Sequence, residues 1–375
     1  SIIPFIFSEN YTGFLLTYFS FLSLVFLMDK HRGIKLISLQ YLGVVLFFLF
    51  FLILLRFDFN HLKEYLGTAI RMIIAVIISI LISKNKFIEF YTRIITAYAA
   101  FSIAVFVLGC LFPDKIQLLP ISYNDAGTGY RHIYVYFFQG IESWNFRNAG
   151  IFWEAGAFQV YLSIALLFDF YLLKKSRLRE TILILAIIST FSSIGFAILS
   201  LLMIFSAFSK PTLSRMLLVI LYVSAFFYFG IYDSFFVNKF NGVNISGIDR
   251  IVGQLADLEL FFSSPIYGVG FSGYAASFNS IAYSLGAIAP TSSNSFTGLL
   301  ALNGVFYSLL IFVPMFMFFF RHQIRIKYRI EMLCCFILLL SSQGLFNQLL
   351  FLIVLFYGLQ INTIKNPLLT NEKIV

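Results

Sequence analysis

The chain has 375 residues, of which 60% are hydrophobic, 19% aromatic and only 11% charged. Soluble domains are nearer half apolar and a quarter charged, so this composition excludes a water-soluble globular protein, a disordered chain and a coiled coil. In a membrane protein, a net charge of +9 reflects the concentration of Lys and Arg in cytoplasmic loops. The positive charge therefore does not require a nucleic acid partner, and none is expected. The composition predicts an all-α, polytopic integral membrane protein with a single membrane domain over residues 1–375.

Apolar runs separated by polar breaks predict about 11 transmembrane helices. In chain order these cover Tyr11–Met28, Ile34–Leu55, Gly67–Ser83, Ile94–Phe112, Ile151–Leu173, two arms within Thr181–Ser209, Met216–Gly230, Asn294–Phe320, Met332–Phe346 and Gln348–Ile361. Two long polar stretches, about 113–150 and 231–293, interrupt the series. Most of the 26 basic residues fall in the other connections, which predicts that both long stretches face outward.

The run Thr181–Ser209 has basic residues at both ends, in Lys174–Arg179 and in Lys210–Arg215. If both sets lie in the cytoplasm, the chain must cross outward and return. We therefore predict a break near Ser189–Gly195, with the sequence STFSSIG, whose polar tip would lie at a water-filled cavity. A single long tilted helix is the alternative, and it would place the second basic set on the outer side.

The second polar stretch contains a predicted amphipathic helix over Gly247–Phe262. Its apolar residues recur at helical spacing, with Asp249, Gln254 and Asp257 between them. The apolar set is Ile248, Ile251, Val252, Leu255, Leu258 and Phe262.

The segment Arg147–Gln159 reads RNAGIFWEAGAFQ and joins the first polar stretch to the following predicted span. Glu154 would lie about one turn inside the membrane edge, where a carboxylate is costly unless it faces a partner or a wet cavity. Such a carboxylate can accept a proton from an attacking hydroxyl or orient that hydroxyl. The alternative is an interfacial helix start, because acidic residues favour helix N-termini and Trp gathers at membrane interfaces.

This segment resembles the G-I-F-W-E-P-G motif of O-antigen polymerases (Wzy type) and of related capsule and exopolysaccharide polymerases, and it has the same place after an external loop. Later pieces agree in order. STFSSIGFAIL resembles the family's Ser/Thr-rich turn. GIDRIVGQLADLELFFSSPIYGVGFSGY resembles its Arg-helix and P-I-x-G-x-G turn, and TSSNSFTGLLALNGVFY resembles the polar start of its next span. The resemblance covers roughly Arg147 to Phe320. Ala155 replaces the usual Pro, and Ser293 stands where many ligase-type relatives carry His.

The resemblance implies an inverting, metal-independent glycosyltransferase of the GT-C-like membrane class, in the bacterial inner membrane with its active site facing the periplasm. The implied donor is an undecaprenyl-pyrophosphate-linked oligosaccharide, and the acceptor is a hydroxyl of a second lipid-linked repeat unit. The polar stretches 113–150 and 231–293 would then be periplasmic loops. A chain-length regulator and a flippase are implied partners, and no cofactor is implied.

A pyrophosphate leaving group needs positive charge, and Arg suits it best because its planar fork binds phosphate oxygens bidentately. The candidate catalytic residues are Arg147, Glu154 and Arg250. The candidate substrate-binding residues are Arg71, Arg131, His132, Tyr274, Ser293 and Asn294. Snorkelling to lipid phosphate is the alternative for Arg71, and helix capping is the alternative for Ser293 and Asn294. Glu142, Asp249 and Asp257 remain alternatives to Glu154 as the base.

Two other functions remain open. An O-antigen ligase would use the same chemistry with lipid A core as acceptor, although the motif spelling and the missing His argue against it. A polysaccharide flippase or transporter would show inverted repeats and more charge near the membrane midplane.

Overall fold

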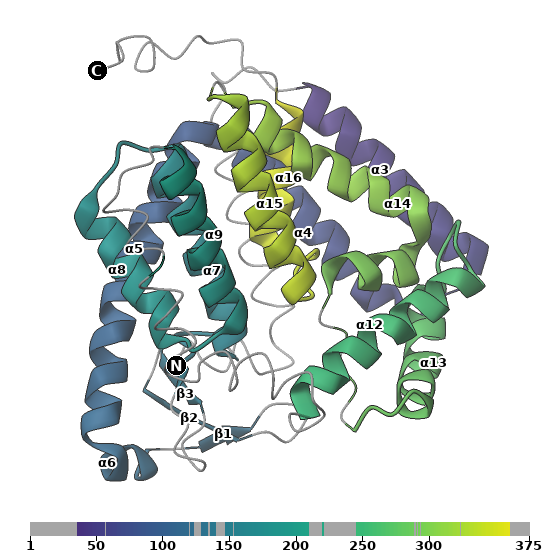
Figure 1. Ribbon diagram of the computed structural model, residues 1–375. Helices are drawn as coiled ribbons and strands as arrows, with labels where there is room; N and C mark the ends of the chain where they lie inside the picture. The colour runs from purple at the N-terminus through teal and green to yellow at the C-terminus, as the bar shows by residue number, and fades with distance from the viewer. Residues whose placement is uncertain are drawn as a thin grey trace.

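The computed structural model describes residues 36–56, 58–119, 121–123, 129–133, 136–139, 147–152, 154–209, 220, 245–288, 290, 292, 294–322 and 324–360. This part of the chain is mostly helical (Figure 1). The predicted span Tyr11–Met28 lies outside the described residues, and so does Met216–Gly230 apart from residue 220.

The described helices follow the predicted order. They are α3 (Leu36–Arg56), α4 (Leu62–Leu81), α5 (Lys84–Leu111), α6 (Pro113–Gln117), α7 (Ala155–Tyr171), α8 (Arg177–Ser189), α9 (Ser193–Ser209), α12 (Ile245–Ser263), α13 (Gly270–Ser284), α14 (Ser295–Phe320), α15 (Ile326–Ser342) and α16 (Leu349–Leu359), with a short 3₁₀ helix η1 (Phe59–His61) before α4. Four segments are long and apolar enough to cross a membrane: Ile37–Arg56, Phe59–Leu81, Lys84–Leu111 and Ser295–Phe320. The chain is therefore a membrane protein, while α7, α9 and α16 are shorter apolar helices.

The core of the bundle lies around α16, whose residues from Leu350 to Gly358 are all buried. This helix packs against α14 and α4. The contact with α14 is close, because a Cβ placed on Gly358 would lie 1.8 Å from the carbonyl oxygen of Pro314. A fully apolar helix of 11 residues is stable here because neighbouring helices cover every face.

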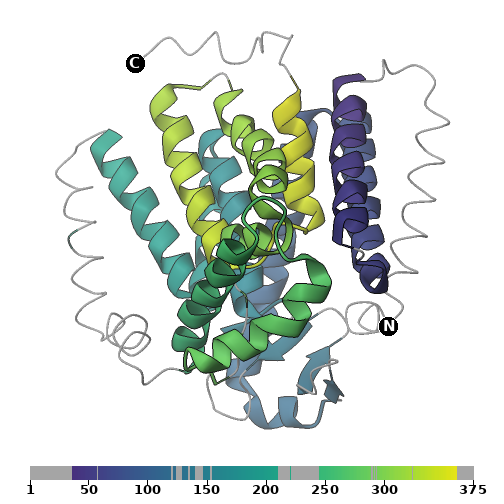
Figure 2. The ribbon, with the colours of Figure 1, turned by 90° about the vertical axis from the view of Figure 1, so that its right-hand side faces the viewer.

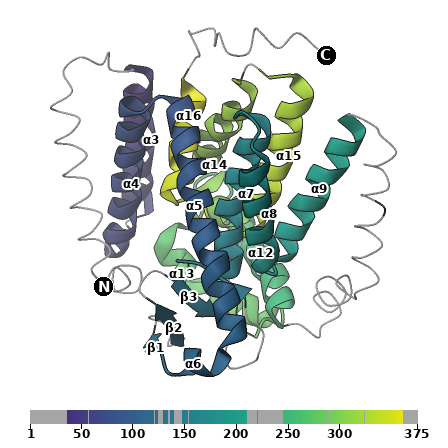
Figure 3. The same ribbon diagram turned by 90° about the vertical axis from the view of Figure 1, so that its left-hand side faces the viewer.

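The described parts of the two predicted external stretches lie at one end of the bundle (Figure 1). Figures 1 and 3 show α6 and the strands at the same end as α12 and α13, and Figure 2 shows α12 and α13 crossing this end beside α3. The basic connections that follow α4, α7 and α14 lie at the opposite end. This arrangement agrees with the charge pattern of the sequence.

The first external stretch contains a small sheet, which the all-α prediction did not include. Its strands are β1 (Ile121–Tyr123), β2 (Gly129–Ile133), β3 (Tyr136–Gln139) and β4 (Arg147–Asn148). They pair antiparallel in the order β1-β2-β3-β4. Phe138 stands opposite Arg131 on one side and Asn148 on the other. The sheet therefore carries Arg147 and Asn148 to the base of the helices.

The predicted break within Thr181–Ser209 is confirmed. Helix α8 ends at Ser189 and α9 begins at Ser193, so a single long helix is wrong. Phe191, between them, has φ of 46°, a conformation that costs a bulky residue free energy and persists only where its surroundings fix it.

Helix α14 is interrupted at Gly304, whose φ of 74° and ψ of −179° are not helical. The turn between α12 and α13, residues 264–269, fills the interruption. Val305 N donates to Pro265 O at 2.9 Å, and Val269 N donates to Ala301 O at 2.8 Å. The P-I-x-G-x-G turn, which begins at Pro265, is therefore in contact with α14 at Gly304, and both segments belong to the sequence resemblance.

The predicted amphipathic helix is confirmed as α12, but its apolar residues do not form one face. Ile248 and Val252 pack inward with Phe278 of α13, whereas Ile251, Leu255 and Phe262 are exposed. The sequence analysis did not predict α13.

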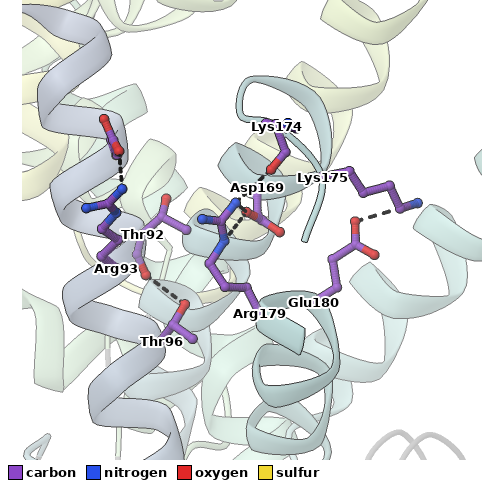
Figure 4. A network of polar contacts seen from close by, with 9 residues as sticks. Thr92, Arg93, Thr96, Asp169, Lys174, Lys175, Arg179 and Glu180 are labelled. Atoms are coloured by element: carbon purple, nitrogen blue, oxygen red, sulfur yellow. Dashed lines mark hydrogen bonds and ion pairs between the residues drawn. The ribbon is translucent and has the colours of Figure 1, made fainter. Parts of the chain in front are cut away.

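Ionic contacts tie α7 to α8 at the opposite end of the bundle, beside α5 (Figure 4). The Arg179 guanidinium lies 2.6 Å from the buried Asp169 carboxylate and also donates to Lys174 O at 2.7 Å. Lys175 pairs with Glu180 beside it. Arg179 thus closes the connection between α7 and α8.

Candidate functional site

Arg147 holds the turn between α8 and α9. Its Nε donates to Thr190 O at 3.0 Å, and its Nη2 donates to Phe191 O at 3.3 Å. A cation at the C-terminal end of α8 satisfies carbonyls that have no partner within the helix and complements the helix dipole. Nη1 takes no part in these two bonds. Arg147 therefore joins the RNAGIFWEAGAFQ segment to the Ser/Thr-rich turn and fixes the strained backbone at Phe191.

Asn148 anchors the same strand from within the protein. Its Nδ2 donates to Ser189 Oγ at 2.8 Å and to Ser102 Oγ at 3.2 Å, while its Oδ1 accepts from Tyr136 Oη at 3.1 Å. Asn148 is fully buried. These bonds connect β4 with β3, α5 and α8, so Arg147 stands on a rigid base.

Glu154 is the N-cap residue of α7, but its side chain makes no capping hydrogen bond to the first turn. Its carboxylate lies instead beside Gly156, and so does the side-chain amide of Gln343 in the α15–α16 connection. A Cβ placed on Gly156 would lie 3.4 Å from Glu154 Oε1 and 2.7 Å from Gln343 Nε2. The missing side chain at residue 156 thus leaves room for the Gln343 amide beside the carboxylate.

Arg147, Glu154 and Arg250 lie close enough to interact electrostatically. The pKa of Arg147 is lowered from its usual value, chiefly because burial disfavours its charge; the Glu154 carboxylate opposes this, and the Arg250 guanidinium adds to it. Two like charges near each other favour a bound anion, because an anion between them stabilises the charged form of both. Arg147 on β4 therefore lies within electrostatic range of Glu154, at the start of α7, and of Arg250 on α12.

Asp257 organises the next part of the site. This fully buried carboxylate accepts hydrogen bonds from Tyr274 Oη at 2.6 Å, Ser292 Oγ at 2.8 Å and Thr297 Oγ1 at 2.9 Å. Burial raises its pKa, and the bonds from these hydroxyls oppose the shift. Asp257 lies two turns after Arg250 on α12, so it fixes that helix against α13 and the start of α14.

Two residues at the start of α14 have structural partners. Asn294 caps the helix, since its Oδ1 accepts from Phe296 N at 2.8 Å. Ser295 Oγ donates to Gln343 O and accepts from Leu345 N at 2.8 Å, which links α14 to the connection that faces Glu154. The predicted substrate-binding residue Ser293 lies outside the described residues.

The remaining predicted binding residues are not brought to Arg147. Arg131 and His132 lie on β2, where Arg131 donates to the carbonyls of Gln117 and Leu119 and His132 contacts the ring of Phe137. Arg71 lies on α4 and donates to Gly67 O of its own helix at 3.0 Å. The hydroxyl of Tyr274, on α13, donates to Asp257 Oδ1 at 2.6 Å.

Sequence reasoning missed Gln343 and gave no rank to Asp257. Gln343 stands in the polar break SSQG between two apolar runs, and such a break inside a bundle could have marked it. The carbonyls of residues 190 and 191 carry no sequence signal, because any residue supplies a carbonyl.

Among the described residues, no group of three or more His, Cys, Asp or Glu side chains could hold a metal ion. No family model, curated protein or solved structure matches this chain.

Proposed function

We propose that this protein is a polysaccharide polymerase of the bacterial inner membrane, which transfers a growing glycan from undecaprenyl pyrophosphate to a hydroxyl of a lipid-linked repeat unit. The observation that carries the proposal is the electrostatic interaction of Arg147 with Glu154 and with Arg250. Two guanidinium groups and one carboxylate in the same region suit a reaction that expels a pyrophosphate and deprotonates a hydroxyl. The motif order of the sequence supports the same conclusion.

In this proposal each group has one task. Arg147 and Arg250 bind the pyrophosphate oxygens and stabilise the charge that develops as the bond from the sugar C1 to phosphate oxygen breaks. Glu154 accepts the proton of the acceptor hydroxyl while that oxygen forms the new bond to C1 from the opposite face. The products are the lengthened glycan on the acceptor's lipid, with inverted configuration, and undecaprenyl pyrophosphate.

The other residues hold this arrangement. The carbonyls of the α8–α9 turn orient Arg147, and the Asp257 cluster fixes the helix that carries Arg250. Gln343 faces Glu154 across Gly156. Preorganised charges of this kind lower a barrier without rearrangement during the reaction.

Deleting the gene and separating the cell's lipopolysaccharide on a gel distinguishes the candidate functions. A ladder reduced to core plus one repeat supports the polymerase. Loss of every O-antigen band with polymer still on the lipid carrier indicates a ligase, and repeats held at the cytoplasmic face indicate a flippase. An unchanged ladder directs the same test to capsule or exopolysaccharide, and an unchanged glycan in all three contradicts the proposal.

Substitutions test the site itself. We expect Arg250→Ala and Glu154→Gln to lower the polymerisation rate by about 10²–10³-fold, the usual effect of removing one group that stabilises developing charge. Lys115→Ala is the matched control, because Lys115 is an exposed basic residue at the same end of the bundle. Equal amounts of each variant in the membrane are required. Full-length polymer from both site variants would contradict the assignment.

A further inference from the structure

We propose that the exposed apolar face of α12 and the turn after it, defined by Ile251, Leu255, Phe262, Ile266 and Tyr267, lies against the acyl chains of the membrane. The segment would then be a re-entrant, lipid-contacting element of the membrane domain and not a water-exposed loop. The inference concerns only the placement of the segment, so it stands independently of the proposed reaction.

The first observation is the composition of this face. Phe262 is 72% exposed, Ile266 47% and Tyr267 37%. Ile251, Leu255 and Phe262 are four and seven residues apart, which places them on one side of a helix. The opposite side of α12 is occupied by the core it shares with α13. A helix with apolar residues on both sides, one of them exposed, is stable where the exposed side meets lipid.

The second observation is where the turn meets α14. The bond from Val305 N to Pro265 O lies at the eleventh residue of this 26-residue candidate span. The turn therefore meets the span at its interruption, within its length and not at either end.

The third observation is continuity with a lipid-facing helix. The ring of Tyr267 lies 6.4 Å, between centroids, from the ring of Phe51 on α3. Phe51 belongs to the candidate span Ile37–Arg56, and it stands about 8 Å from the end of that span. Neighbouring side chains on the same helix, Phe47 and Phe50, are also exposed. The exposed face of the turn therefore extends the surface that α3 presents to lipid.

The charge on this segment is consistent with such a placement. Glu259 is the exposed acidic residue within α12, and it lies at the edge of the apolar face, about 80° from Ile251 at 3.6 residues per turn. The Asp257 carboxylate lies away from the face, where it accepts hydrogen bonds from Tyr274 and Thr297. Interfacial helices place charge at their borders and apolar residues at their centre in this way.

The test measures the depth of single Trp probes in vesicles of phosphatidylethanolamine and phosphatidylglycerol with brominated acyl chains. The native Trp144 and Trp153 are first replaced by Phe. Phe262→Trp and Ile266→Trp then probe the face. Phe51→Trp on α3 is the lipid-facing control, and Ile133→Trp on the external sheet is the water-facing control.

We expect bromine to quench Phe262→Trp and Ile266→Trp as strongly as it quenches Phe51→Trp, whereas acrylamide in the water quenches only Ile133→Trp. Quenching of the two probes by acrylamide and not by bromine would overturn the proposal in favour of a water-exposed loop. Quenching by neither would also overturn it, because the face would then be covered by protein. Monodisperse elution of each variant in detergent shows that the probes report on folded chain.

Discussion

Replacing Gly304 by Ala tests whether the interruption of α14 is essential to the fold. Gly304 has φ of 74°, in a region that residues with a side chain rarely adopt. A Cβ at this position would also lie 2.2 Å from the carbonyl oxygen of Ile266. The substitution therefore strains the backbone and collides with the turn that fills the interruption.

The expected loss of stability follows from these two effects. Backbone strain of this kind costs about 1–3 kcal/mol. Relieving the collision requires the turn to move by more than 1 Å, which disturbs the hydrogen bonds from Val305 N and Val269 N, each worth about 0.5–1.5 kcal/mol. We expect the free energy of unfolding to fall by about 2–6 kcal/mol, which is on the order of thirtyfold or more in the folded-to-unfolded ratio.

Gly43→Ala is the matched control. Gly43 lies within α3, and a Cβ there would meet nothing within 4 Å, so Ala should stabilise the helix by about 0.5–1 kcal/mol. Unfolding of both variants and the wild type is followed by circular dichroism in the same detergent against increasing SDS. If Gly304→Ala unfolds at the same SDS fraction as Gly43→Ala, the argument from backbone geometry is wrong.

Three further predictions follow from described contacts. Arg179→Ala should destabilise the chain by about 3–5 kcal/mol because it removes the ion-pair partner of the buried Asp169 carboxylate. In the same unfolding assay Arg93→Ala, which removes an exposed pair, should cost about 0–1 kcal/mol. Burial raises the pKa of Asp257, so Asp257 stays protonated to a higher pH in the native state than in the unfolded state. The free energy of unfolding therefore falls as pH rises from about 4 to that raised pKa. The melting temperature of Asp257→Asn should change less with pH than that of the wild type. Gly156→Ala should displace the side-chain amide of Gln343, because the added Cβ would lie 2.7 Å from its Nε2. We expect the unfolding midpoint to stay nearly unchanged and polymerisation to fall. Normal polymer from this variant would remove the reason for linking Gln343 to Glu154.

The apolar helices could be predicted from the sequence, because a run of apolar residues has few other stable states in a membrane. The break at STFSSIG was also predictable, because polar residues and flanking basic charges both pointed to it. The sheet was not, because its strands are two to five residues long and their pairing depends on partners distant in the chain.

The candidate site shows the same division. The residue types of Arg147, Glu154 and Arg250 led to the proposed chemistry, and Arg147 interacts electrostatically with the other two. Their supports could not be read from the sequence: the carbonyls that hold Arg147 have no side-chain signature, and the exchange of hydrogen bonds between Ser295 and the connection after α15 joins residues about fifty positions apart. The sequence also could not show which apolar residues of α12 are buried and which are exposed, because periodicity places residues on one side of a helix but does not tell what packs against that side.

The attachment of β4 to the α8–α9 turn also has a consequence for how the protein is made. Arg147 and Asn148 bind residues that follow them by 43 and 41 positions, so the ribosome completes the strand long before it completes the carbonyls and hydroxyl that hold it. The described part of the first polar stretch therefore makes these contacts only after α7 and α8 have been synthesised. The final position of Arg147 is coupled to completion of the α8–α9 turn, and a nascent chain that ends before residue 189 lacks the groups that hold Arg147 and Asn148 in place.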